Sequence, residues 1–129
     1  MSIMKRRSAL AGLLLFASIA IAEPIDVSLI TLIAKPADFD GKQVRVKGFA
    51  RVEFEGNAIY LHRDDYLYGI TKNGLWLDLE MVPSKAAAGA DKRYVLIEGV
   101  FSMEEQGHFG LWSGSIKQIT RIQPWPARR

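Results

Sequence analysis

The sequence predicts a small, mostly β domain in which five strands form a closed barrel after one short helix. From about residue 43 onward, apolar and polar residues alternate with a period of two, which is typical of half-buried strands. Two of these segments contain a central glycine, Gly48 and Gly99, where a strand can bend enough for a small barrel. The 129-residue chain is long enough for one such domain with a single core.

The first expected element is a short helix over residues 28–35. Ser28 is a typical N-cap, and Pro36 ends the helix because proline cannot continue it. The apolar face consists of residues spaced i, i+3, i+4, namely Leu29, Leu32 and Ile33. The Asp40-Gly41 pair then predicts a turn into the first strand.

The first strand is expected to be long, beginning at Gln43. The face expected in the core carries Val44, Val46, Ala50, Val52 and Phe54. The opposite face, expected in solvent, carries Arg45, Lys47, Phe49, Arg51 and Glu53. Residues 55–57 predict a hairpin loop, after which the chain returns as a second strand over residues 58–62.

The remaining elements alternate in the same way. Asp64 and Asp65 predict the cap of one helical turn, and Asn73-Gly74 predicts a turn into a third strand over residues 75–81. Residues 83–92 are expected to form a loop or a short helix, residues 93–103 a fourth strand and residues 107–114 a glycine-rich connection. A fifth strand over residues 116–122 is expected from context only, because its isoleucines are three residues apart. The predicted buried set is Val44, Val46, Val52, Leu77, Leu79, Val95, Ile97 and Phe101.

The segment 36–48, PADFDGKQVRVKG, resembles the entry to the first strand of many bacterial OB-like domains. In those domains a short helix, a turn of the form P-x-x-[FY]-x-G-K-x-V and a glycine-containing strand follow one another. The resemblance implies an OB-like barrel, which is a five-stranded Greek-key fold. The chain after residue 22 is also similar to small exported proteins of Gram-negative bacteria without an assigned function. That similarity implies no catalytic residue.

The N-terminal residues have the layout of a secretory signal peptide. Three basic residues, 5–7, precede an apolar run over residues 9–21, and Ala20-Ile21-Ala22 forms an A-x-A cleavage site. The run is too short for a membrane-spanning helix, which needs roughly 20 apolar residues. We therefore expect cleavage after Ala22, a periplasmic or secreted protein, a barrel domain over residues 23–123 and a loosely held tail over residues 124–129.

The net charge and the cysteine content of the chain limit the classes of partner and of covalent link that we expect. The whole chain carries 17 Lys and Arg against 14 Asp and Glu, but three of the basic residues lie in the predicted signal peptide. The mature protein is then neutral overall, which disfavours nucleic acid as a partner. The chain contains no cysteine, so a disulfide and a lipid-modified cysteine are both excluded.

The most promising candidate site is an aromatic and basic face on the first three strands. Its expected ligand-binding residues, with two from the glycine-rich connection, are Arg45, Phe49, Arg51, Tyr60, His62, Trp76, His108 and Trp112. Aromatic planes stack on rings, and arginine supplies charge and forked hydrogen bonds. The alternative is that a helix or a partner subunit covers these rings, or that Phe49 and Trp76 pack against the N-terminal helix. The sequence thus favours a non-catalytic binding module without a cofactor, whose partner is an envelope protein, a glycan or a small molecule.

Two alternative functions remain open at this point. A metal-dependent enzyme or metal-binding protein could use His62, His108 and the nearby acids Asp64 and Asp65, although the two histidines lack the spacing of known metal motifs. The second alternative is weak binding of single-stranded nucleic acid on the aromatic face.

Overall fold

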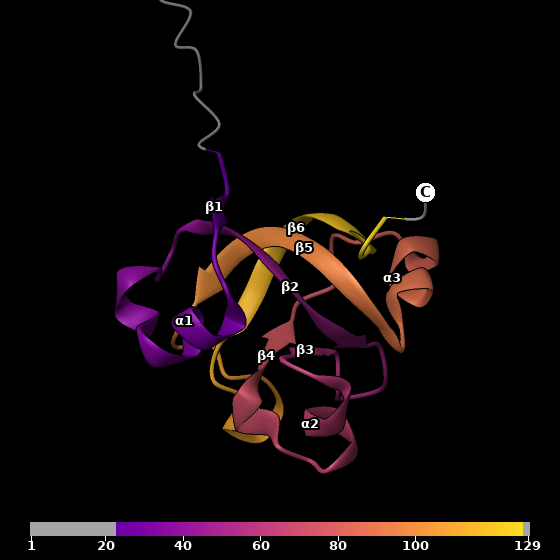
Figure 1. Ribbon diagram of the computed structural model, residues 1–129, viewed down its shortest axis with the longest axis horizontal. Coiled ribbons are helices and arrows are strands. Elements are labelled where there is room, and N and C mark those ends of the chain that lie inside the picture. Colours follow the sequence, from indigo (N-terminus) through magenta and orange to yellow (C-terminus); the bar gives the residue numbers. More distant parts are fainter. Residues whose placement is uncertain (1–22, 128–129) are drawn as a thin grey trace, which may run out of the picture.

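A computed structural model describes residues 23–127, so the predicted signal peptide and cleavage site lie outside the described residues (Figure 1). The helices are α1 (Leu29–Ala34), α2 (Arg63–Leu67) and α3 (Ser84–Ala90), with 3-10 turns η1 (Pro36–Asp38), η2 (Thr71–Asn73) and η3 (His108–Gly110). The strands are β1 (Ile25–Asp26), β2 (Gln43–Arg51), β3 (Ala58–Tyr60), β4 (Gly74–Leu77), β5 (Arg93–Ser102) and β6 (Ser115–Pro124). In the described part of the chain, no helix has the length and apolar character needed to cross a membrane.

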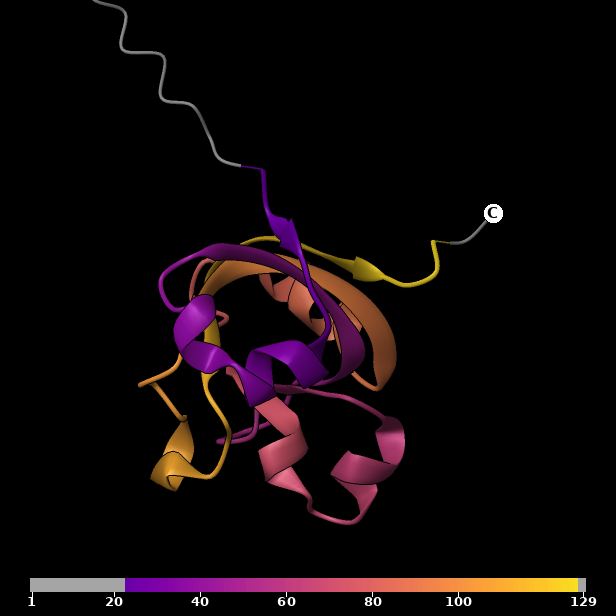
Figure 2. The ribbon, with the colours of Figure 1, turned by 60° about the vertical axis from the view of Figure 1, so that its left-hand side comes forward.

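Five of the strands form a closed barrel, so the predicted small β-rich barrel is confirmed. Their order is β2-β3-β4-β6-β5, and the barrel closes through antiparallel pairing of β2 with β5 from Gln43↔Val100 to Ala50↔Arg93. β4 and β6 pair in parallel. Figure 2 shows β2 and β5 curving together around the barrel. The short β1, which the sequence did not predict, pairs in parallel with the first half of β2, which β3 does not reach.

The core contains most of the residues predicted for it. Val44, Val46, Leu77, Val95, Ile97 and Phe101 are fully buried, and Leu29 and Leu32 of α1 join them. Val52 and Leu79 are only partly buried. Each lies beyond the end of its strand, since β2 ends at Arg51 and β4 ends at Leu77.

The expected alternation of faces along β2 stops at Gly48. From Gly48 to Arg51 every residue is buried, because α2 and the start of β5 cover the outer face of this half of the strand. The prediction that Arg51 is exposed is therefore wrong, whereas Lys47 is exposed as predicted. Phe54, predicted on the core face, is 92% exposed because it lies in the loop after the strand has ended.

An irregularity in β6 explains why its isoleucines are three residues apart. Between the pairs Glu98↔Arg121 and Val100↔Lys117, residues 118–120 stand opposite Gly99 alone. Gln118 has a positive φ of 49°, which changes the direction of the strand locally. This bulge lets both Ile116 and Ile119 reach the core.

Candidate functional site

Six aromatic side chains form a continuous band on the outside of β2, β3 and β4, which we name the aromatic belt. Its members are Phe49, Tyr60, Tyr66, Trp76, Tyr94 and Trp112. The ring of Phe49 lies 5.5 Å from the ring of Tyr94 and 6.2 Å from that of Tyr66, centroid to centroid. Tyr66 lies 5.7 Å from Tyr60. The rings of Tyr94, Phe49, Tyr66 and Tyr60 thus follow one another in this order and form one half of the belt.

The two tryptophans extend the belt toward the loop 103–114. Their ring centroids are 5.0 Å apart, and the Trp112 indole N–H donates a hydrogen bond of 3.3 Å to the Tyr60 hydroxyl. Burial raises the pKa of the Tyr60 phenol above its ordinary value, so the hydroxyl remains protonated near neutral pH. The sequence placed Tyr60, Trp76 and Trp112 in one site, and the fold does bring them together.

Most of this belt is covered. Phe49, Tyr60 and Trp112 are each less than 5% exposed, whereas Tyr66 and Trp76 are half-buried and Tyr94 is 44% exposed. Of the two possibilities that the sequence left open, an exposed and a covered aromatic face, the structure thus shows a largely covered one, whose rings pack against one another.

Arg51 lies between two carboxylates beside the belt. Its Nε donates to Oδ1 of Asp91 at 2.9 Å, and its Nη2 donates to Oε2 of Glu53 at 3.0 Å. The guanidinium lies 4.3 Å above the ring of Tyr66. Burial alone would favour neutral Asp91, but the hydrogen bonds from Val52 and Arg51 outweigh it and hold the pKa of Asp91 below its ordinary value.

A cavity of about 380 Å³, which we name the basic pocket, opens between β2, α2 and the start of β5. Its lining consists of Phe49, Arg51, Arg63, Tyr66, Leu67 and Lys92. Three of these six residues are cationic and none is acidic. Tyr66 and Leu67 supply apolar surface beside the cations, so the lining can hold an anionic group and an apolar group together.

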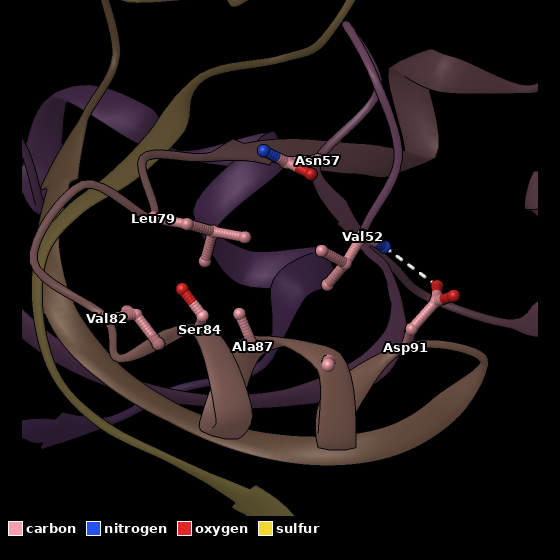
Figure 3. A pocket seen from close by; sticks show the side chains of 8 residues that line it. Val52, Asn57, Leu79, Val82, Ser84, Ala87 and Asp91 are labelled. Atoms are coloured by element: carbon pink, nitrogen blue, oxygen red, sulfur yellow. Dashed lines mark hydrogen bonds between the residues drawn. The ribbon is translucent and has the colours of Figure 1, made fainter.

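A second cavity, which we name the apolar cavity, lies on the other side of Asp91 and has a volume of about 450 Å³ (Figure 3). It is lined by Val52, Asn57, Leu79, Val82, Ser84, Ala87, Ala88 and Asp91. Figure 3 shows Val52, Leu79 and Ser84 directed toward one another, and the Val52 amide donating to Asp91 at 2.8 Å. This hydrogen bond and the Arg51 pair both use Oδ1 of Asp91.

Three residues of the predicted site lie apart from both the aromatic belt and the two cavities. Arg45 is paired with Glu98 at 2.9 Å on the β5 side of β2. His62 lies beyond the end of β3, exposed at the start of α2, where its backbone N–H donates to Asp65. The His108 Nε2 lies 3.1 Å from Oε2 of Glu55 in the loops.

Asp65, one of the two acids proposed as metal ligands, is occupied by other contacts, whereas Asp64 is exposed. Oδ1 of Asp65 accepts a hydrogen bond from Asn73 and Oδ2 accepts one from the His62 backbone, which fixes the segment between β3 and β4. Over residues 23–127, no three His, Cys, Asp or Glu residues come together as a metal site would require.

Five residues of the belt and the basic pocket were not predicted from the sequence: Arg63, Tyr66, Leu67, Lys92 and Tyr94. Tyr66 lies in the predicted helical turn, but nothing in the sequence shows that this turn folds back over Phe49. Lys92 and Tyr94 reach the site because β5 pairs with β2 in the register Phe49↔Tyr94.

The chain matches no protein-family model and no curated protein.

Proposed function

We propose that the protein is a non-catalytic binding module that holds a small anionic ligand with an aromatic or apolar part in the basic pocket. The observation that carries this proposal is the lining itself, where Arg51, Arg63 and Lys92 surround ring surface without a carboxylate among them. An anion there gains charge-assisted hydrogen bonds, while its apolar part covers Tyr66 and Leu67.

The three cations of the basic pocket differ in whether their side chains are free to contact a ligand. Arg51 is already paired with Glu53 and Asp91, so its charge is compensated and it contributes mainly to the shape of the pocket wall. Arg63 and Lys92 are exposed and form no ion pair with another described residue. These two side chains can turn toward an incoming anion without breaking a contact of the fold.

The chemistry of the lining favours binding over catalysis. The six lining residues include no serine, histidine or carboxylate that could act as a nucleophile or general base. The strand order β2-β3-β4-β6-β5 supports the OB-like interpretation, in which the outer face of the early strands carries the ligand. The N-terminal sequence supports export, so we propose that the ligand is met in the periplasm or outside the cell.

Phenyl phosphate is a suitable probe because it combines an anionic group with a ring. In calorimetric titrations we expect it to bind more tightly than inorganic phosphate, and to bind less tightly as salt is added. Lys92→Ala and Arg63→Ala should each weaken its binding about tenfold, the effect of losing one charged contact. Lys85→Ala, which removes an exposed lysine of α3 outside the basic pocket, is the matched control.

Three results would overturn the proposal. The first is equal affinity of phenyl phosphate for the wild type, Lys92→Ala and Arg63→Ala, because the basic pocket would then not hold the anion. The second is release of phenol during incubation with the pure protein, because the protein would then catalyse hydrolysis. Complete absence of phenyl phosphate binding would exclude this ligand class.

A further inference from the structure

Two loops at one end of the barrel each expose a phenylalanine. Phe54 lies in the loop 52–57 and is 92% exposed, and Phe109 lies in the loop 103–114 and is 86% exposed. Among the described residues, no other large hydrophobic side chain is as exposed as these two. Side chains this exposed bury little apolar surface, so packing against the core does not explain why they are phenylalanines.

The two loops are joined next to these rings. Nε2 of His108 lies 3.1 Å from Oε2 of Glu55, so the neighbours of Phe109 and Phe54 in sequence are in direct contact. The ring of His108 also packs on the ring of Phe109, with 4.0 Å between centroids. We name the four residues Phe54, Glu55, His108 and Phe109 the loop tip.

The loop behind Phe109 is firmly anchored to η2. The Lys72 ammonium donates to the carbonyl oxygens of Gly110 and Trp112, both at 3.3 Å. The Thr71 hydroxyl donates to the Leu111 carbonyl at 2.9 Å, and the Ser113 hydroxyl donates to the Lys72 carbonyl at 2.6 Å. An exposed ring on an anchored loop loses little freedom when a partner binds it.

Both joined loops hold a non-glycine residue in the left-handed region. Glu55 has a φ of 54° and Phe109 has a φ of 55°. Glycine adopts this conformation without strain, whereas a bulky aromatic residue rarely does. Strained backbone of this kind concentrates at functional positions, and here it coincides with the exposed rings.

The charges of the two loops indicate the kind of partner. Loops 52–57 and 103–114 contain no lysine or arginine but four glutamates, namely Glu53, Glu55, Glu104 and Glu105. Glu53 and Glu105 are paired with Arg51 and Lys117, so among the described residues Glu55 and Glu104 are the two loop carboxylates without a Lys or Arg partner. This remaining negative charge repels nucleic acids and anionic lipids and attracts a basic surface.

We propose that the loop tip docks a second protein through a basic segment that carries apolar side chains. Phe54 and Phe109 act as the anchors, and Glu55 and Glu104 pair with Lys or Arg at the rim of the interface. This surface is separate from the basic pocket, so it would allow the protein to hold a small ligand and a partner protein together.

A random peptide library displayed on phage and selected on the immobilised protein tests this proposal. We expect the selected peptides to combine Lys or Arg with apolar residues and to bind more weakly as salt rises. Synthetic copies should lose about tenfold or more in affinity for Phe54→Ala and for Phe109→Gly, as expected for interface anchors. Tyr68→Ala, which removes a ring that is 78% exposed on another part of the surface, should bind them like the wild type.

Phe109→Gly separates binding from folding, because glycine removes the ring and also relieves the positive φ. Its melting temperature should equal or exceed that of the wild type while its peptide affinity falls. The proposal is wrong if no peptide is selected, if the selected peptides are not basic, or if they bind the loop-tip variants unchanged. Sedimentation with phosphatidylcholine vesicles, or a dimer that Phe54→Ala dissociates, would also overturn it, by showing a membrane or a second copy as the occupant.

Discussion

The Nε atom of Arg51 lies 2.9 Å from Oδ1 of Asp91, and this ion pair belongs to the walls of two cavities at once. Arg51 lines the basic pocket and Asp91 lines the apolar cavity. The pair therefore fixes the boundary between them and ties β2 to the end of α3. A change at either residue is expected to alter both cavities and the stability of the barrel.

Arg51→Ala should destabilise the fold more than loss of any exposed arginine. The variant leaves Asp91 and Glu53 without their shared cation and removes the guanidinium that lies above Tyr66. Hydrogen bonds to charged groups contribute about 1.5–3 kcal/mol, so a loss of this size is expected in urea denaturation. Arg121→Ala, which breaks the more exposed pair with Glu98, should cost only about 0–1 kcal/mol. Equal losses would show that the Arg51 cluster contributes no more than a surface ion pair.

Protonation of Asp91 should lower the stability of the protein in acid. Its pKa is lowered in the folded state, so below the unfolded value of about 3.9 the unfolded chain binds more protons than the folded one. This stabilisation is complete above that value and is lost as the pH falls through the folded pKa. Urea midpoints measured from pH 6 downward should therefore fall less steeply for Asp91→Asn than for the wild type.

The control for this pH dependence is Thr120→Ala, which changes an exposed side chain without a titratable group and should keep the wild-type slope. Some slope will remain in Asp91→Asn because the pKa of Glu98 is also lowered. Burial there opposes ionisation, and the hydrogen bonds from Arg45 and Arg121 outweigh it. An unchanged slope in Asp91→Asn would contradict the role assigned to the Arg51–Asp91 pair.

Two glycines should respond to alanine in opposite directions. A Cβ on Gly48 would lie 2.5 Å from the Tyr60 carbonyl oxygen and 2.8 Å from Cγ1 of Ile59, so Gly48→Ala should cost about 1–3 kcal/mol. Gly89 lies in α3 with no atom within 4 Å of its added Cβ, so Gly89→Ala should stabilise by about 0.5–1 kcal/mol. Thermal melts of the two variants check both signs, and a stabilising Gly48→Ala would contradict the close approach of β2 and β3.

Local sequence patterns predicted the barrel well because each pattern depends on the residues of a single strand or helix. The period of two and the glycine inside β2 follow from the pleat and the bend of that strand, and Ser28 caps α1 as expected. The Ser28 hydroxyl accepts the Thr31 amide N–H at 3.1 Å, a contact within four residues of sequence.

The candidate site was predicted only in part because it depends on contacts between distant segments. Phe49 and Arg51 have the spacing of a solvent face, and only the packing of α2 and the register of β2 with β5 bury them. Arg63 and Lys92 are separated by 29 positions in sequence, so no local pattern places both of them in the basic pocket. Phe54 was assigned to the core because the alternation was continued past the end of β2.

Cleavage of the N-terminal segment can be tested directly. If Ala20-Ile21-Ala22 is read by a signal peptidase, protein produced with its full N-terminus in a Gram-negative host should begin at Glu23. Intact-mass measurement of the periplasmic fraction checks this. Replacement of Ala22 with a bulky residue, Ala22→Phe, should retain the precursor, whereas exported protein that begins at Met1 would contradict the prediction.

Phe49 and Lys92 should separate the structural part of the basic pocket from the part that binds. Phe49 is 3% exposed and packs on Tyr66 and Tyr94, so Phe49→Ala should cost about 3–5 kcal/mol of folding stability and weaken ligand binding with it. Lys92 is exposed, so Lys92→Ala should change stability by less than about 0.5 kcal/mol while weakening phenyl phosphate binding. Urea denaturation and calorimetric titration of the same two preparations measure both quantities.

Because Lys92 has a φ of 60°, Lys92→Gly is the further variant that loses the charge and relaxes the backbone. If Lys92→Gly melts higher than the wild type yet binds phenyl phosphate as tightly, the cation at position 92 has no part in the site.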